Sequence, residues 1–451
     1  MSGAQGKFVT GSLMRHVVVM SLSGAMGLSF TFLVDFLALW WISQLRVEAM
    51  IAAVGMAGTI QFAVFSIAIG MMIGAVALVS RTIGQGDREC ARRIATLAML
   101  LTAGVQAIVA ALIYVFRIPV LQATGAEGEV LALAEHFLSV TLPSMPLIAA
   151  AICASAILRA VGDAWRSMAV TMVAGAVAVV LDPLLIVWAG WGVTGAAWSI
   201  VAARVAMFGV GLWFVISTHD MLARPVRGDI PTYMPPYLGI ALPAIVTQIS
   251  TPFGNWILTR EVAEFGESAV AGWGVVMRLT ILAFGGIFAL SGAIGGIIGQ
   301  NYGARRPDRV EGAYWAALKF CAVYTLATWA IMAALTGPII RSFGLSSEGA
   351  AIVEAFTYYA AGAFIFTGAL FVANATFNNL ARPLWSTGAN WFRDGVLMLP
   401  LGIAFTVTTG AVGVVWANAL ANVIAGIVAA WLAWRYIRSL NRTEAVATAA
   451  E

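Results

Sequence analysis

The sequence predicts an all-α polytopic membrane protein in which twelve transmembrane helices form two six-helix bundles, related by a pseudo-twofold axis along the membrane normal. Three observations support this fold class. The 451 residues are 61% hydrophobic and only 10% charged, whereas a soluble protein carries about 25% charge. The apolar residues gather in runs that reach the roughly 20 residues needed to cross a bilayer. Short patterns in the first half recur about 219 residues later, as expected of a duplicated membrane unit.

The first half contains six of these apolar runs. A chain in lipid must satisfy its own backbone hydrogen bonds, so each run is expected to be a helix. None shows the alternating polarity of a barrel strand. The first run is too long for the apolar region of a cleavable signal peptide, which spans about 7–15 residues. The six spans are expected at about 14–41, 50–79, 93–116, 131–157, 167–190 and 194–217.

A polar connection at residues 219–236 separates the two halves, and its prolines and glycine suit a linker. We therefore predict an N-terminal six-helix lobe (1–218), a cytoplasmic linker (219–236) and a C-terminal six-helix lobe (237–451). The spans of the second lobe are expected at about 237–259, 269–299, 312–336, 353–379, 384–408 and 411–434.

The basic residues predict the orientation of the chain. Of the 25 Lys and Arg, 17 fall on the termini and the even-numbered loops, and only four fall on the odd-numbered loops. The positive-inside rule then places both termini in the cytoplasm. We predict a multi-pass protein of the bacterial cytoplasmic (inner) membrane. Its three cysteines indicate no disulfide framework.

The repeated patterns lie at matching places in the two halves. Residues 80–87 read SRTIGQGD and residues 300–308 read QNYGARRPD, and Gly303 follows Gly84 by 219 residues. Gly192 and Gly410 begin a second pair of similar segments. An even number of helices in each half gives both halves the same orientation. The axis should therefore run along the membrane normal, with a cavity between the lobes.

These residues resemble the MATE (multidrug and toxic compound extrusion) family of the polysaccharide-exporter superfamily, its DinF-like branch more than its NorM-like branch. The resemblance covers almost the whole chain and includes both glycine loops, Leu181–Leu185 and Phe265–Glu267. It implies a secondary active antiporter, not an enzyme. Such a protein exchanges H⁺ or Na⁺ for drugs or toxic organic cations by alternating access, and needs no cofactor beyond the coupling ion.

Two carboxylates stand alone within apolar runs: Asp35 in the first span and Asp182 in the fifth. A charge at the centre of a helix costs about 2.5–3.5 kcal/mol on insertion scales, so such a residue is a functional hypothesis. The family carries functional acids at corresponding places. We predict that Asp35 and Asp182 couple transport to H⁺, or hold Na⁺ together with nearby hydroxyls. A structural hydrogen-bonding role is the alternative for each.

The second lobe lacks matching acids, because Leu399 occupies the place of Asp182. We therefore place cation coupling in the N-terminal lobe. Arg393 and Asp394 are interpreted as an internal, structural ion pair. Several amides and one hydroxyl in the seventh and tenth spans are candidate substrate-binding residues, with helix packing as an equal alternative: Gln248, Thr251, Asn255, Asn374 and Asn378.

Several classes of function lack sequence support. The chain has no Walker A motif, no Cys/His metal cluster and no basic patch for nucleic acid. We expect a monomer whose partners are small-molecule drugs and membrane lipids. The sequence leaves two alternatives. One is a lipid-linked oligosaccharide or lipid flippase of the same superfamily. The other is an intramembrane protease that uses an Asp pair, which the duplicated body argues against.

Overall fold

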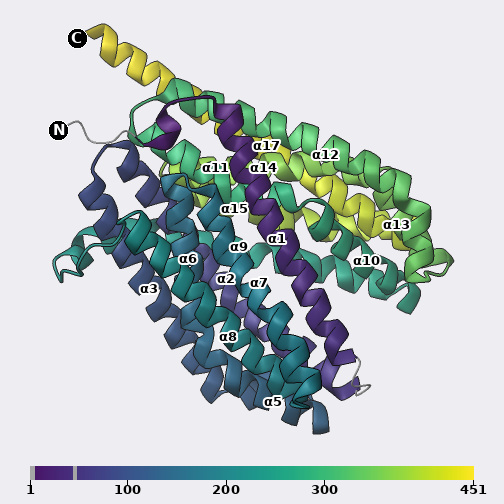
Figure 1. Cartoon of the computed structure of the whole chain (residues 1–451). Coiled ribbons are helices and arrows are strands. Elements are labelled where there is room, and N and C mark those ends of the chain that lie inside the picture. The colour runs from purple at the N-terminus through teal and green to yellow at the C-terminus, as the bar shows by residue number, and fades with distance from the viewer. Residues whose placement is uncertain (1–5, 44–47, 451) are drawn as a thin grey trace. The chain divides into compact units, whose positions relative to one another are not determined.

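The computed structural model describes residues 6–43 and 48–450, apart from the side chains of residues 35, 36, 39, 43, 48 and 443–450. This part of the chain folds almost entirely as long helices and contains no β-strand (Figure 1). The predicted all-α polytopic fold class is confirmed.

The first half contains the six predicted spans, but two are more elaborate than expected. The fourth span is broken near Pro143 by a short 3₁₀ turn, and a short helix, α4, precedes it. The fifth and sixth spans each end in a π-helical turn, η3 and η4. The elements are η1 (Lys7–Val9), α1 (Leu13–Ser43), α2 (Glu48–Gly84), α3 (Arg88–Val115), α4 (Arg117–Ala123), α5 (Gly128–Thr141), η2 (Leu142–Ser144), α6 (Met145–Val161), α7 (Ala164–Asp182), η3 (Pro183–Trp188), α8 (Gly192–Trp213) and η4 (Phe214–Thr218).

The second half is helical from Asp229, eight residues before the predicted start of the seventh span. Its helix α9 therefore includes the last part of the expected linker, although this part holds three prolines. The elements are α9 (Asp229–Ala263), α10 (Glu267–Ala283), α11 (Gly285–Gly303), α12 (Pro307–Phe343), α13 (Ser347–Tyr358), η5 (Ala360–Ala363), α14 (Phe364–Asn379), α15 (Pro383–Trp391), η6 (Phe392–Leu397), α16 (Met398–Thr409), η7 (Gly410–Val412) and α17 (Gly413–Ala450).

Hydropathy and length identify most of these helices as membrane spans. Within the described residues, nine helical runs are long and apolar enough to cross a membrane, and α10 with α11, bent by 49°, makes a tenth. One run, Pro383–Arg442, covers 60 residues and holds two of the predicted spans, which η7 separates. These runs and the bent pair account for all the predicted spans except the seventh. The seventh is α9, whose prolines and polar side chains lower its hydropathy. Each predicted span thus corresponds to a helix or a pair of helices.

The chain forms two compact units. Unit 1 contains residues 1–25, 80–86 and 246–451, and unit 2 contains residues 26–79 and 87–245. Three helices, α1, α2 and α9, contribute to both units. These boundaries differ from those of the predicted lobes, because contacts define the units whereas the sequence repeat defines the lobes.

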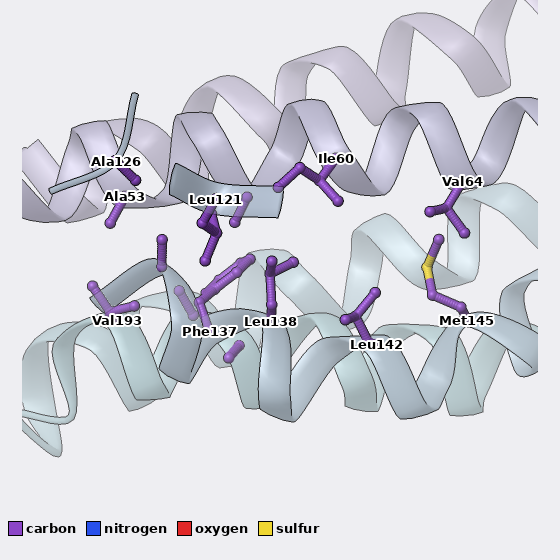
Figure 2. Packing of buried hydrophobic residues seen from close by; sticks show 14 of the residues in the cluster. Ala53, Ile60, Val64, Leu121, Ala126, Phe137, Leu138, Leu142, Met145 and Val193 are labelled. Atoms are coloured by element: carbon purple, nitrogen blue, oxygen red, sulfur yellow. The ribbon is translucent and has the colours of Figure 1, made fainter. Parts of the chain in front are cut away.

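Unit 2 is held by an apolar core between α2, α4, α5, α6 and α8. Leu121 of α4 and Phe137 and Leu138 of α5 are fully buried there. Figure 2 shows the side chains of α2, such as Ile60 and Val64, facing those of α5 and its continuation into α6. Burial of an aromatic or branched aliphatic side chain contributes about 1.5–3 kcal/mol. The short helix α4 is therefore part of this core through Leu121.

The residues after η4 are tied to unit 2 by polar contacts. Arg92 of α3 donates to the Asp220 carboxylate and to the Leu222 carbonyl oxygen, both at 2.9 Å. His219 Nε2 lies 2.8 Å from the carboxylate of Asp163, which caps α7. The first part of the predicted linker is thus bound to the N-terminal ends of α3 and α7.

Asp163 is the centre of that attachment. Burial alone would raise the pKa of its carboxyl, but hydrogen bonds from the Arg166 backbone and guanidinium and from His219 outweigh burial. These bonds hold the pKa of Asp163 below its ordinary value.

The repeat is visible in the backbone as well as in the sequence. Residues with a left-handed backbone recur at matching positions in the two halves, three pairs at a spacing of 219 and one at 220. The pairs are Gly86 with Arg305, Gly125 with Gly344, Gly162 with Ala381, and Gly190 with Gly410. Non-glycine residues seldom adopt this conformation. Arg305 (φ 54°) and Ala381 (φ 61°) therefore keep the turn of the first half without its glycine.

The two glycine loops contact each other within unit 1, and the contact is reciprocal. A Cβ added to Gly84 would lie 2.0 Å from the Gln300 carbonyl oxygen, and one added to Gly303 would lie 1.9 Å from the Arg81 carbonyl oxygen. Gln300 follows Arg81 by 219 residues, as Gly303 follows Gly84. Gly84 contacts Gln300, and the equivalent residues of the other half, Gly303 and Arg81, contact each other in the same way. Only glycine fits at this distance.

Candidate functional site

Asp182 lies in unit 2 at the junction between α7 and the π-helical turn η3. Its residue is 3% exposed. Ser199 of α8 lies beside the carboxylate, although its Oγ forms no hydrogen bond within the described residues. No basic side chain pairs with Asp182 in this part of the chain. The structure therefore presents an isolated, buried carboxylate in a membrane span.

The sequence around Asp182 explains the local geometry. Pro183 follows directly and cannot donate a backbone hydrogen bond, so the regular ladder is interrupted and the π turn begins. Gly195 of α8 packs against this turn, since a Cβ there would lie 2.5 Å from the Leu185 carbonyl oxygen. Single π turns often mark functional positions in helices.

Asp35 lies in α1, but its side chain is outside the described part of the structure. The neighbouring residues show where this part of α1 packs. Phe30 and Val34 contact α7 at Gly175, where an added Cβ would meet them at 2.6 and 3.0 Å. Gly175 lies about two turns before Asp182. The two helices that carry the predicted coupling acids thus pack together in unit 2.

The candidate residues of α9 have unequal surroundings. Thr251 Oγ1 accepts a hydrogen bond of 3.0 Å from Arg393 of η6, whereas Gln248 and Asn255 are half-buried. The three residues recur every three or four positions, so they share one face of α9.

Asn374 and Asn378 lie one turn apart on α14. The Oδ1 atom of each is buried and has no hydrogen-bond partner within the described residues. The backbone carbonyls of Asn378 and Asn379 accept hydrogen bonds of 3.1 and 2.7 Å from Arg81. The two amide oxygens can therefore still accept hydrogen bonds from a ligand or from water.

The Arg393–Asp394 pair was expected from the sequence, but its environment was not. Arg393 Nε and Nη2 donate to the two Asp394 oxygens at 2.7 and 2.8 Å, and the two residues are 4% and 1% exposed. Arg393 Nη1 also donates to Asn422 Oδ1 of α17 at 3.3 Å. Gly254 of α9 makes room for the acid, since its added Cβ would lie 2.8 Å from Asp394 Oδ1.

A small cavity in unit 1 lies beyond Asn422. It measures about 10 Å³, room for about one water molecule. Asn418, which accepts a 2.9 Å hydrogen bond from Asn422 Nδ2, also lines it. Trp273 Nε1 and Thr367 Oγ1, from two other lining residues, are buried and have no hydrogen-bond partner in the described part of the chain. This site has no signature in the sequence, because its polar atoms come from three separate helices.

Two half-buried arginines of unit 2 have no carboxylate partner among the described residues. Arg204 of α8 donates to the Gln61 side chain of α2. It also donates to the Ser144 hydroxyl and the Thr141 carbonyl oxygen, both at the break in the fourth span. Arg159 of α6 donates to the hydroxyls of Ser155 and Ser167, and its Nε has no hydrogen-bond partner in the described part of the chain. These two side chains bring positive charge into the interior of unit 2.

Comparison with known proteins identifies the family. The MatE family model matches residues 25–184 and 243–404, two segments that start 218 residues apart. The FAD transporter of Shewanella oneidensis is 27% identical over 441 residues, 96% of each chain. The multidrug export protein MepA of Staphylococcus aureus is 22% identical over 445 residues, 94% of each chain.

Solved structures share the fold. A MOP superfamily transporter from Pyrococcus furiosus has a TM-score of 0.88 at 23% identity and covers 97% of this chain and 99% of its own. An outward-facing multidrug resistance MATE transporter has a TM-score of 0.87 at 24% identity, with the same coverage. The family match covers most of the chain and both halves of the repeat, and its members are transporters. The chain therefore belongs to the MatE family of membrane transporters and is not an enzyme.

Proposed function

We propose that this protein is a secondary active multidrug efflux transporter that exchanges H⁺ or Na⁺ for amphipathic, often cationic compounds by alternating access. Family membership supports transport, and relatives named as multidrug export proteins support drugs as the substrate class. We further propose that it acts as a monomer in the bacterial inner membrane, with both termini in the cytoplasm.

The main observation in favour of ion coupling is that Asp182 is buried without a basic partner among the described residues. An ionised carboxylate in an apolar interior is strongly disfavoured unless a partner neutralises it. No basic side chain does so within the described residues. The carboxylate is therefore expected to bind a proton or a metal cation, which is what a coupling site must do.

The driving force is large enough for export. One charge that moves down 100 mV supplies about 2.3 kcal/mol, and one pH unit adds about 1.4 kcal/mol. Together they support roughly a 500-fold gradient of a neutral substrate. One H⁺ per neutral substrate molecule is therefore sufficient, and the same holds for one Na⁺ at a comparable gradient.

The test is transport of labelled tetraphenylphosphonium by purified protein in proteoliposomes. Ionophores collapse the pH gradient and the Na⁺ gradient separately. Loss of uphill transport on collapse of one gradient identifies the coupling ion. Uphill transport that survives the collapse of both gradients and of the membrane potential contradicts the proposal.

A second candidate is export of an anionic, phosphate-bearing aromatic compound. The relative named as an FAD transporter favours it, and so do Arg159 and Arg204, which have no carboxylate partner among the described residues. Transfer of a labelled lipid in the same proteoliposomes separates both candidates from the flippase alternative.

A further inference from the structure

The Arg393–Asp394 pair lies at the centre of a polar chain that crosses the apolar interior of unit 1. On one side Arg393 donates to Thr251, which belongs to the predicted substrate-binding face of α9. On the other side it donates to Asn422, which leads to Asn418 and the cavity. Five elements, α9, η6, α17, α14 and α10, thus contribute polar atoms to one site.

We propose that Asp394 is a second coupling carboxylate, located in unit 1, and that the cavity binds a water molecule that stabilises Arg393 when Asp394 is protonated. This inference rests on the proposed ion-coupled transport, to which it adds a site in the half of the protein where the sequence indicated none.

The chemistry follows from charge balance. With both residues ionised, the pair is neutral and hydrogen-bonded at two points. When a proton from the medium adds to a lone pair of an Asp394 oxygen, Arg393 keeps all its protons and the site gains one positive charge. A lone buried cation is strongly disfavoured. The remaining donors of Arg393 must then be solvated through Asn422 and Asn418.

The cavity supplies that solvation. A water molecule in it can accept from Trp273 Nε1, exchange a hydrogen bond with Thr367 Oγ1 and interact with Asn418. A buried water usually makes two to four such bonds. Trp273 Nε1 and Thr367 Oγ1 have no partner among the described residues, so a water would satisfy both. The water would therefore give hydrogen-bond partners to two buried polar atoms whose residues line the cavity.

The neighbouring elements bring few other charges. The cavity residues of α10, α14 and α17 are neutral. Glu261 of α9 lies against α16, where its Cγ would be 3.5 Å from a Cβ added to Gly402. Gly402 lies about two turns beyond Asp394. Protonation of Asp394 therefore alters mainly Arg393, and through it the contact with Thr251 of α9.

The first experiment does not depend on transport. Infrared spectra of the purified protein are recorded during a pH titration, and the carboxylic-acid band of wild type is compared with that of Asp394→Asn. We expect part of the band to be missing in the variant. Identical bands would show that Asp394 stays ionised and would overturn the inference, whether or not the protein is an antiporter.

The second experiment uses proteoliposomes with labelled tetraphenylphosphonium. In Asp394→Asn we expect uphill transport to fall by about tenfold or more, while exchange without an ion gradient is retained. Equal loss of both activities would indicate a structural role and overturn the inference. Absence of ion-driven transport in wild type would overturn the proposed function as well. The double variant Arg393→Met with Asp394→Asn removes both charges. It should give the same result if Asp394→Asn alone does not fold.

The water site has a matched pair of variants. Thr367→Val removes a hydroxyl that makes no hydrogen bond within the described residues, so the fold should be retained. Thr376→Val, on the same helix, removes a hydroxyl that donates to the Val372 carbonyl oxygen at 2.7 Å. We expect Thr367→Val, and not Thr376→Val, to weaken ion-driven transport relative to exchange. Equal transport ratios in the two variants would contradict a role for the cavity.

Discussion

At the scale of single residues, burial has different consequences for Asp182 and Asp394. Both carboxylates are almost fully shielded from solvent. Asp394 has an arginine bound at two points, whereas Asp182 has only Ser199 beside it among the described residues. A buried acid without a counter-ion must gain a cation, but a paired acid can remain charged. We therefore expect Asp182 to bind a proton or cation directly, whereas protonation of Asp394 would change the charge of its pair with Arg393.

We expect Asp182→Asn to abolish uphill transport while the protein still folds and inserts. The amide keeps the size and hydrogen-bonding capacity of the carboxyl but cannot bind a proton or a cation in its place. Asp35→Asn should have the same effect, as the sequence predicts. Proteoliposome transport at matched protein amounts is the measurement. Normal uphill transport in either variant would remove that residue from the coupling site.

Ala381 should be replaceable by glycine with a gain in stability. A non-glycine residue in the left-handed region costs roughly 1–2 kcal/mol, and the counterpart of Ala381 in the first half is Gly162. We expect Ala381→Gly to raise the thermal midpoint in detergent, and Gly162→Ala to lower it. A lower midpoint for Ala381→Gly would show that its methyl group contributes packing that exceeds the backbone strain.

At the scale of elements, the close approach of the ends of α2 and α11 depends on two glycines. Gly303→Ala would place a methyl group 1.9 Å from the Arg81 carbonyl oxygen, so the helices must separate. We expect a strong loss of transport with normal membrane insertion. Gly104→Ala is the matched control, because nothing lies within 4 Å of its added Cβ in α3. Full activity in Gly303→Ala would show that the contact is dispensable.

The attachment of residues 219–223 to unit 2 should depend on pH through Asp163. Its folded pKa is lowered, so its ionised form contributes stability that is present above the ordinary aspartate pKa of about 3.9 and is lost as pH falls through the folded value. The protection of these residues against hydrogen exchange, relative to the intrinsic rate at each pH, should stay high near neutral pH and fall only in acid.

Asp163→Asn should make that exchange faster even at neutral pH. Asparagine still caps α7, so the variant removes only the charge that Arg166 and His219 contact. Asp87→Asn is the control, because Asp87 caps α3 through Cys90 without touching His219. Equal exchange in the two variants would exclude the Asp163 charge as the cause.

The membrane spans could be predicted from sequence because lipid imposes length and apolarity on each helix. The sites within the helices could not. The π turn after Asp182 depends on packing against Gly195, and the cavity depends on atoms from separate helices. Arg204 illustrates the limit most clearly, since its partners lie 60 to 143 residues away. Hydrophobic patterning carries no information about such pairings.

At the scale of the whole molecule, the substrate class depends on the sum of charges around the transport path. The predicted acids favour cations, whereas Arg159 and Arg204 favour anions. We expect labelled tetraphenylphosphonium to be transported by wild type, with little competition from FAD. Competition measured in proteoliposomes decides the question. Displacement of tetraphenylphosphonium by FAD at similar concentrations would instead support the anionic candidate.

The reciprocal glycine contact also bears on ancestry. Before duplication, a single six-helix chain would have made this contact as a symmetric homodimer, with one glycine contacting the partner copy's backbone. Fusion then allowed the side chains to diverge. Arg81 now binds the carbonyl oxygens at the end of α14, whereas its counterpart Gln300 accepts the Phe8 backbone N–H at 2.8 Å. The backbone contact left no such freedom, so Gly84 and Gly303 preserve the ancestral subunit interface.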